Sequence, residues 1–274
     1  MFHLALHSGP LNPLLDILLG VSAQHLWLLN HHDKSMASIA SLYFERGLKT
    51  CNEMMSEINS NYCLLFPCSM VITLKSLLSR FEPGSDVRYE TPLPWFRATR
   101  GVRVIASAGK PWIMASKLSP LLQKILEDIV LDHVVDDPIF TPLMANLESN
   151  SEPENMQAYA SAIQYLSWIY ATSEGVEDNH ALRQKVLAFI YWVSPLFMSL
   201  LGVRDPRALV ITAHFFGLIK GADDVWFLKG LAEREILGIR TLVPEDWMWA
   251  MEWPLKQIQS PSALPDLRQS VLAF

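Results

Sequence analysis

The sequence predicts an all-α fold: a single domain of about ten helices over residues 1–274, enclosing an internal apolar cavity. Three observations predict it. Every regular apolar pattern in the chain repeats at intervals of three or four residues. No alternating pattern flanked by hairpin turns occurs. Half of the 274 residues are hydrophobic and only 18% are charged, so the chain has more apolar side chains than an ordinary core needs.

Apolar stripes mark the first three helices. The first covers Leu14 to Leu29, and the second runs from Met36 to Ile58. A third is expected to follow Pro67 and to end at Glu82-Pro83-Gly84, where proline and glycine terminate helices.

Prolines and capping side chains place the later helices. At several points a Ser or Asp, expected as the helix cap, directly precedes a Pro, expected as the first helical residue. The expected helices are Pro94 to Ala108, Ser119 to Leu131, Asn155 to Thr172, Asp178 to Val193, and helices beginning at Pro195, Pro206 and Asp223.

Residues 132–154 have a different composition, rich in Asp, Glu and Pro. This stretch is predicted to be a long acidic loop on the surface, with a lid over a cavity as the alternative.

Charge and cysteine content exclude several classes of protein. A formal net charge of -6 leaves no basic footprint, so the chain is expected to make no direct contact with nucleic acid. Arg97, Arg100 and Arg103 line one helix face and are expected to be solvated. Three cysteines make neither a disulfide framework nor a zinc cluster, which favours buried thiols in an intracellular protein.

The amino-terminal segment predicts neither export nor membrane insertion. The first basic residue is Lys34, so the basic region of a secretory signal is absent. The apolar run from Leu14 to Leu29 is short and contains Asp16, Gln24 and His25, so no membrane span is expected.

No catalytic or cofactor motif is found, and neither a cofactor nor a metal is predicted. The acidic pairs Asp136-Asp137 and Asp223-Asp224 lack the third aspartate of a terpene cyclase magnesium site.

Five segments in order carry a resemblance to a known family. They are Leu18–Leu26 (LLGVSAQHL), Trp95–Val102 (WFRATRGV), Asp205–Phe215 (DPRALVITAHF), Trp226–Gly230 (WFLKG) and Trp247–Pro254. Together they resemble the carboxy-terminal regulatory domain of fungal zinc-cluster transcription factors, in particular the sterol-uptake control type. The resemblance covers about residues 10–254.

The resemblance implies an all-helical, often dimeric domain with a hydrophobic pocket for a sterol. It places Gly230 near that pocket, where a glycine would leave room for a ligand; close helix packing is the alternative. Such regulators also carry a basic six-cysteine DNA-binding module, which this chain lacks, so the chain is expected to be either an excised domain or a free-standing protein.

Helical phase and the family segments give the candidate site. The expected ligand-binding residues are His25, Tyr43, Trp95, Val210, His214, Gly217, Trp226 and Gly230. If the chain is an enzyme, His25 and His214 could act as acid and base, and Tyr43 as a donor. The alternative for each histidine is a core side chain hydrogen-bonded to a backbone carbonyl.

Three functions remain open at this point. The first is a regulatory domain that binds a lipophilic molecule, sterol-like or terpenoid-like, and acts in the nucleus and cytoplasm. The second is a cytoplasmic biosynthetic enzyme on the same fold that promotes cyclisation of a terpenoid or polyketide. The third is a structural dimerisation module without a pocket, such as a homodimer would use.

Overall fold

The computed structural model describes residues 12–84, 89–126, 138–144, 152–173 and 179–259. Every regular element in these ranges is helical, which confirms the all-α prediction. The chain divides into two compact units: unit 1 is residues 1–87 with 94–129, and unit 2 is residues 88–93 with 130–274. The extent of the single domain predicted over residues 1–274 stays a prediction.

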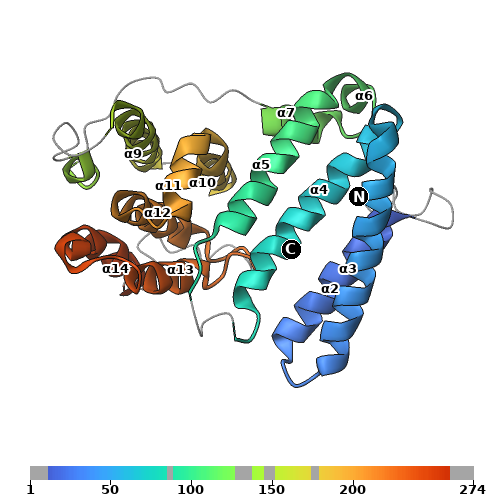
Figure 1. Cartoon of the computed structure of the whole chain (residues 1–274), viewed down its shortest axis with the longest axis horizontal. Coiled ribbons are helices and arrows are strands. Elements are labelled where there is room, and N and C mark those ends of the chain that lie inside the picture. The colour runs from blue at the N-terminus through green and yellow to red at the C-terminus, as the bar shows by residue number, and fades with distance from the viewer. Residues whose placement is uncertain (1–11, 85–88, 127–137, 145–151, 174–178, 260–274) are drawn as a thin grey trace, which may run out of the picture. The chain divides into compact units, whose positions relative to one another are not determined.

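Unit 1 is built on a pair of long helices, α2 and α3, which lie side by side along their lengths (Figure 1). Asn12 begins α2 by accepting hydrogen bonds from the backbone N–H groups of Leu14 and Leu15. The helices described in this unit are α2 (Pro13–Leu29), α3 (Lys34–Met54), α4 (Ile58–Leu78), α5 (Leu93–Ala108), α6 (Lys110–Met114) and α7 (Ser119–Leu126), with the 3-10 turns η1 (Met55–Glu57) and η2 (Ser79–Phe81).

The boundary predicted at Pro67 is wrong. Pro67 lies inside α4, and a single turn of 3-10 helix over Met55–Glu57 separates α3 from α4 instead. A proline inside a helix removes one backbone hydrogen bond and normally costs about 3 kcal/mol. Here Phe66, Pro67 and Cys68 are all buried, so the packing of this segment offsets that cost.

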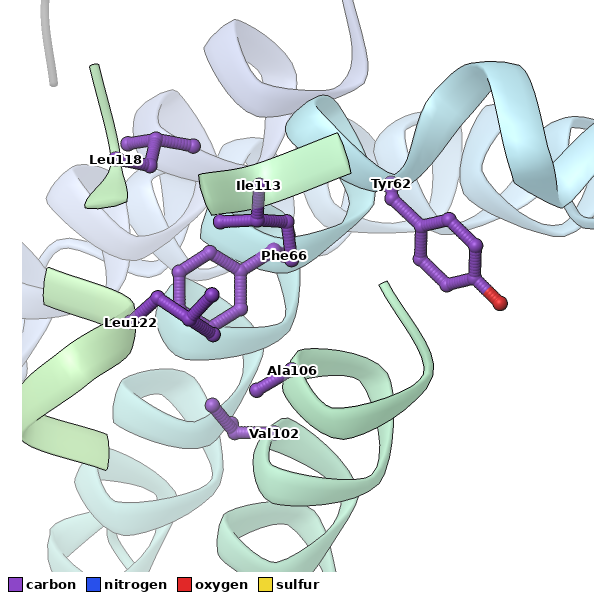
Figure 2. Packing of buried hydrophobic residues seen from close by; sticks show 7 residues of the cluster. All are labelled: Tyr62, Phe66, Val102, Ala106, Ile113, Leu118 and Leu122. Carbon is purple, nitrogen blue, oxygen red and sulfur yellow. The ribbon is translucent and has the colours of Figure 1, made fainter. Parts of the chain in front are cut away.

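The apolar core of unit 1 gathers around Phe66 of α4 (Figure 2). Val102 and Ala106 of α5 approach its ring from one side, and Ile113 and Leu122 approach it from α6 and α7. Tyr62 stacks on Trp112 with ring centroids 5.1 Å apart. Val102 and Ala106 therefore lie on the face of α5 that packs into this core.

The three thiols also lie in unit 1. None of them forms a disulfide, and Cys51 and Cys68 are buried. The two buried thiols are hydrogen-bonded to each other across α3 and α4, and this contact lowers the pKa of Cys51.

Unit 2 surrounds one almost fully buried helix, α12, which contacts most of the other helices of the unit. The predicted caps are confirmed: Asp205 accepts from the N–H of Ala208 at 2.9 Å, and Ser194 accepts from the N–H of Phe197 at 3.1 Å. The helices described are α9 (Pro153–Ser173), α10 (Asn179–Trp192), α11 (Pro195–Gly202), α12 (Pro206–Ile219), α13 (Leu231–Arg240) and α14 (Glu252–Gln259), with the 3-10 turns η3 (Thr141–Met144), η4 (Lys220–Ala222) and η5 (Glu245–Met251).

Two predictions in this unit are corrected. The acidic stretch 132–154 is not wholly a solvated loop, because Phe140 and Leu143 are buried in the core; residues 132–137 and 145–151 lie outside the described residues. The helix expected at Asp223 begins at Leu231 instead. Asp223 accepts the backbone N–H of Gly230 and an ion pair from Lys220, so its carboxylate holds a turn rather than a helix start.

Two apolar helical stretches bear on the prediction that the chain has no membrane span. Within the described residues, the helical stretch Lys34–Phe81 is long and apolar enough to satisfy a length-and-hydropathy criterion for a span, and so does the bent pair Gln184–Trp192 with Pro195–Gly202 when taken together. Core helices satisfy the same criterion, so these stretches carry no argument for a membrane.

Candidate functional site

His214 lies near the end of the family-like segment Asp205–Phe215, and its side chain is only 2% exposed. Its Nδ1 donates a hydrogen bond to the carbonyl oxygen of Val210, one turn earlier in α12, at 2.8 Å. A carbonyl only accepts, so this bond fixes the proton on Nδ1. Val210 itself is fully buried. The structure therefore supports the core-histidine alternative for this residue.

Burial lowers the pKa of His214 to about 4, against a smaller opposing effect of the Val210 carbonyl. The imidazole is therefore neutral near pH 7, because removing it from water penalises the charged form. A neutral ring without access to solvent is poorly suited to acid–base chemistry at neutral pH.

Trp253 of α14 covers the face of His214. The two rings are stacked, with centroids 5.3 Å apart and planes 6° from parallel. Phe140 closes the same cluster, 5.7 Å from both rings, and Tyr170 packs on Trp253 at 6.0 Å. The indole of Trp253 thus occupies the position beside His214 where a flat ligand was expected.

Gly217 is the reason the indole fits there. A Cβ built on Gly217 would lie 2.5 Å from Cζ3 of Trp253, well inside van der Waals contact. The glycine therefore makes room for Trp253 in this structure. The cavity predicted next to His214 and Gly217 is filled by that side chain.

Arg207 gives the Asp-Pro-Arg segment a structural role. Its side chain is mostly buried, and it donates to the carbonyl of Leu143 in η3. Its guanidinium also lies over the rings of Trp247 and Tyr159, 4.9 and 5.7 Å from their centroids. Burial lowers the pKa of Arg207, although arginine remains charged at physiological pH.

Trp226 and Gly230 lie outside this cluster. Trp226 is 52% exposed and packs edge-on against Phe227. Gly230 adopts a left-handed backbone with φ of +77°, and a Cβ added there would meet no atom within 4 Å. Close helix packing is therefore not the reason for this glycine. The left-handed conformation is sufficient, because glycine adopts it without steric cost.

The remaining candidates lie in unit 1. His25 is half-buried on α2. Tyr43 of α3 is half-buried beneath Arg46, whose guanidinium lies 4.8 Å from the ring centroid and also pairs with Asp16. Trp95 is 3% exposed and packs edge-on against Phe96 in α5. His25, Tyr43 and Trp95 lie on three different helices, α2, α3 and α5.

Sequence reasoning missed the role of Phe140. It is a large apolar residue within an acidic, proline-rich stretch, and such a residue is more easily explained by an inward contact than by a solvated loop. That mismatch between Phe140 and its neighbours is the signal that could have placed it in the core.

Comparison with known proteins gives relatives of one kind. The chain is 29% identical over 265 residues to a Zn(2)-C6 fungal-type transcription factor of Gibberella zeae, a match that covers 89% of this chain and 52% of the relative. It is 21% identical over 214 residues to the Zn(2)-C6 fungal-type transcription factor afumD of Aspergillus fumigatus, which covers 77% of this chain and 57% of the relative. The chain thus spans about half the length of the curated relatives it matches.

No family model matches the chain, and no solved structure matches it. The relatives support the fungal Zn(2)-C6 transcription factor family. The chain has three cysteines, fewer than the six that a Zn(2)-C6 cluster requires, so the matched segment is not the metal-binding module.

Proposed function

We propose that this chain is a regulatory segment of a fungal Zn(2)-C6-type transcription factor, distinct from the part that binds DNA. The supporting observation is the similarity to two such factors along most of the chain, 89% in one case, over a region whose described elements are helical and whose three cysteines are too few for a Zn(2)-C6 cluster. The net charge of -6 fits a segment that contacts ligands or proteins rather than nucleic acid. In this role the segment acts in the nucleus and cytoplasm.

A fusion experiment tests this proposal. Residues 1–274 are joined to an unrelated DNA-binding domain, and transcription of a reporter is measured in a fungal host. The expected result is a severalfold change from the reporter level given by the DNA-binding domain alone. An unchanged level, with equal amounts of both proteins in the nucleus, contradicts the regulatory role.

We also propose how a lipophilic ligand of the sterol or terpenoid kind would act on this segment. The ligand takes the place of the Trp253 ring on His214, next to Gly217, and so favours a state in which α14 is displaced. Two features support this mechanism. The ring that the ligand replaces is flat and apolar, and Trp253 is half-buried rather than sealed inside the unit. A change in the exposure of α14 would then alter dimerisation or partner contacts.

The Trp253→Ala variant tests the ligand mechanism separately. Removal of the indole leaves an unfilled apolar volume, which destabilises by about 24 cal/mol per Å3 and which a ligand can fill. A fluorescent sterol should therefore bind Trp253→Ala more tightly than the wild type, while Trp226→Ala, at an exposed tryptophan, should bind like the wild type. If neither protein binds any sterol or terpenoid probe, the ligand mechanism is wrong and the regulatory role stands on the reporter result alone.

The cyclase alternative gains no supporting observation within the described residues. His214 is neutral and buried, and its Nδ1 donates to a backbone carbonyl. His25 and Tyr43 belong to the other unit. The homodimer expected from the resemblance stays a prediction, and size-exclusion chromatography with light scattering decides it.

A further inference from the structure

A cleft of about 280 Å3 opens on unit 1 between α2, α3 and the end of α4, and none of its lining residues belongs to the cluster at His214. Its lining includes Gln24, Trp27, Ala40, Phe44, Lys75 and Glu82. Gly20 lets α2 and α3 approach closely at the base of the cleft, since a Cβ there would lie 3.0 Å from the backbone nitrogen of Phe44. At roughly 30 Å3 for each water, the space would hold about nine water molecules, which suits a small organic ligand.

Two polar atoms of lining residues are buried and have no hydrogen-bond partner among the described residues. They are Oε1 of Gln24, an acceptor, and Nε1 of Trp27, a donor. Gln24 is only 2% exposed. Buried polar atoms are nearly always paired in native proteins, because leaving one unpaired costs about 1–3 kcal/mol. The two unpaired atoms therefore indicate a partner that the described residues do not supply.

The orientation of the Gln24 amide is determined by its neighbours. Its Nε2 lies 2.6 Å from Oε1 of Glu82 and 3.2 Å from the hydroxyl of Ser79. A carboxylate accepts and cannot donate, so the nitrogen must face Glu82. The oxygen of the Gln24 amide is thus the atom left free.

Charges of both signs and an apolar floor complete the cleft. The Lys75 ammonium lies 3.0 Å from the Ser79 hydroxyl and 5.2 Å from the centroid of the Phe44 ring. Glu45 and Glu82 also line the cleft, and the floor includes Ala37, Ala40 and Phe44. The lining therefore offers donors at Trp27 and Lys75, acceptors at Gln24 and the glutamates, and a surface for an apolar side chain.

We propose that this cleft binds a free α-amino acid. Its carboxylate would accept from the Trp27 N–H and pair with Lys75, and its ammonium would donate to Oε1 of Gln24 and pair with Glu45. Its side chain would rest on Phe44. A simple anion has no donor for Gln24 and a simple cation has no acceptor for Trp27, whereas a zwitterion has both. This site is separate from the one proposed at Trp253.

The test is calorimetric titration of the full chain with each of the twenty amino acids. At least one is expected to bind, and Trp27→Phe should weaken that binding about tenfold by removing a donor to a carboxylate while keeping an aromatic ring. Ser41→Trp, at an exposed position of the lining, should block the cleft without disturbing the core. Trp112→Phe, outside the cleft, is the matched control and should bind like the wild type.

Several results would overturn the proposal. One is the absence of binding by any amino acid at millimolar concentration to a wild-type chain whose circular dichroism shows it to be folded. Another is unchanged affinity in both Trp27→Phe and Ser41→Trp. Equal affinity for an N-acetylated, amidated derivative of the bound amino acid would show that the zwitterion is not what the cleft recognises. None of these readouts depends on transcription or on sterol binding, so this proposal and the proposed function fail independently.

Discussion

His214 in α12 and Gln24 in α2 are both polar side chains on apolar helices, and both are 2% exposed. They differ in how the polar atoms of their side chains are hydrogen-bonded. His214 makes its hydrogen bond to its own helix, one turn back, and aromatic rings cover it. Within the described part of the chain, Gln24 makes hydrogen bonds through its nitrogen only and its oxygen has no partner, and the residue lines an open cleft.

This difference separates a structural polar residue from a candidate binding residue. Burial alone does not distinguish the two, because both side chains are equally hidden from solvent. The distinguishing feature is an unpaired atom next to space that a ligand can enter. On this criterion unit 1 offers a ready cleft, whereas the His214 region would have to release Trp253 before it could bind anything.

The largest expected effect tests whether the His214 region is a filled core. Phe140→Ala removes a fully buried ring that contacts both His214 and Trp253. The free energy of unfolding, measured by urea denaturation, should fall by about 3–5 kcal/mol. Trp226→Ala removes an exposed ring and should change it by less than about 1 kcal/mol. Similar losses in the two variants would show that Phe140 is not part of a packed core.

The second prediction concerns pH. The pKa of His214 is lowered from 6.5 to about 4 in the folded chain, so the unfolded chain binds this proton more readily. The stability associated with a neutral His214 is complete above about pH 6.5 and is lost as the pH falls toward 4. Between pH 7.5 and 4, the wild type should lose about 3 kcal/mol more than His214→Phe, which keeps an aromatic ring but cannot titrate. Parallel pH profiles for the two proteins would show that His214 is accessible to protons in the folded state.

The third prediction concerns the contact between Gly217 and Trp253. Gly217→Ala places a methyl group against the indole and should cost about 1–3 kcal/mol in thermal or urea unfolding. The same change made in a Trp253→Leu background should cost much less, because the clashing ring is gone. Equal costs in the two backgrounds would mean that the indole does not lie against Gly217.

The smallest expected effect lies in unit 1. Trp27→Phe removes an N–H that has no partner among the residues the structure describes, so the free energy of unfolding without ligand should stay within about 1 kcal/mol of the wild type. Trp192→Phe is the matched change at another half-buried tryptophan, whose Nε1 donates to the carbonyl of Ser161 at 2.9 Å. It should cost about 1–3 kcal/mol, because the carbonyl loses its partner. A larger loss for Trp27→Phe than for Trp192→Phe would show that the Trp27 N–H is paired.

Much of the fold could be predicted from local signals. The caps at Ser194 and Asp205 and the start of α5 near Pro94 were correct, because a cap depends on a few neighbouring residues. The start of α4 was wrong, since Pro67 is tolerated inside a helix only where the surrounding packing compensates for it. The family-like segments identified the kind of relative, and relatives of that kind were found.

The candidate site was less predictable. Helical phase placed His214 and Val210 in the interior, and both are buried there. Nothing in the local sequence indicates that Trp253 reaches back to cover His214 from a helix that lies well beyond it in the chain. The unpaired oxygen of Gln24 could not be predicted from local sequence either. It depends on Glu82, which accepts a hydrogen bond from the nitrogen of the same amide.

The sequence by itself determined that this protein is helical, where most helices begin, and which side chains are too apolar to face water, because periodicity and capping act over a few residues. Only the tertiary structure decided that Trp253 occupies the cavity expected beside His214. It also decided that a cleft opens between α2, α3 and the end of α4. Whether a space is filled depends on residues that are distant in the chain and on the shapes that meet when they pack, and local sequence carries neither.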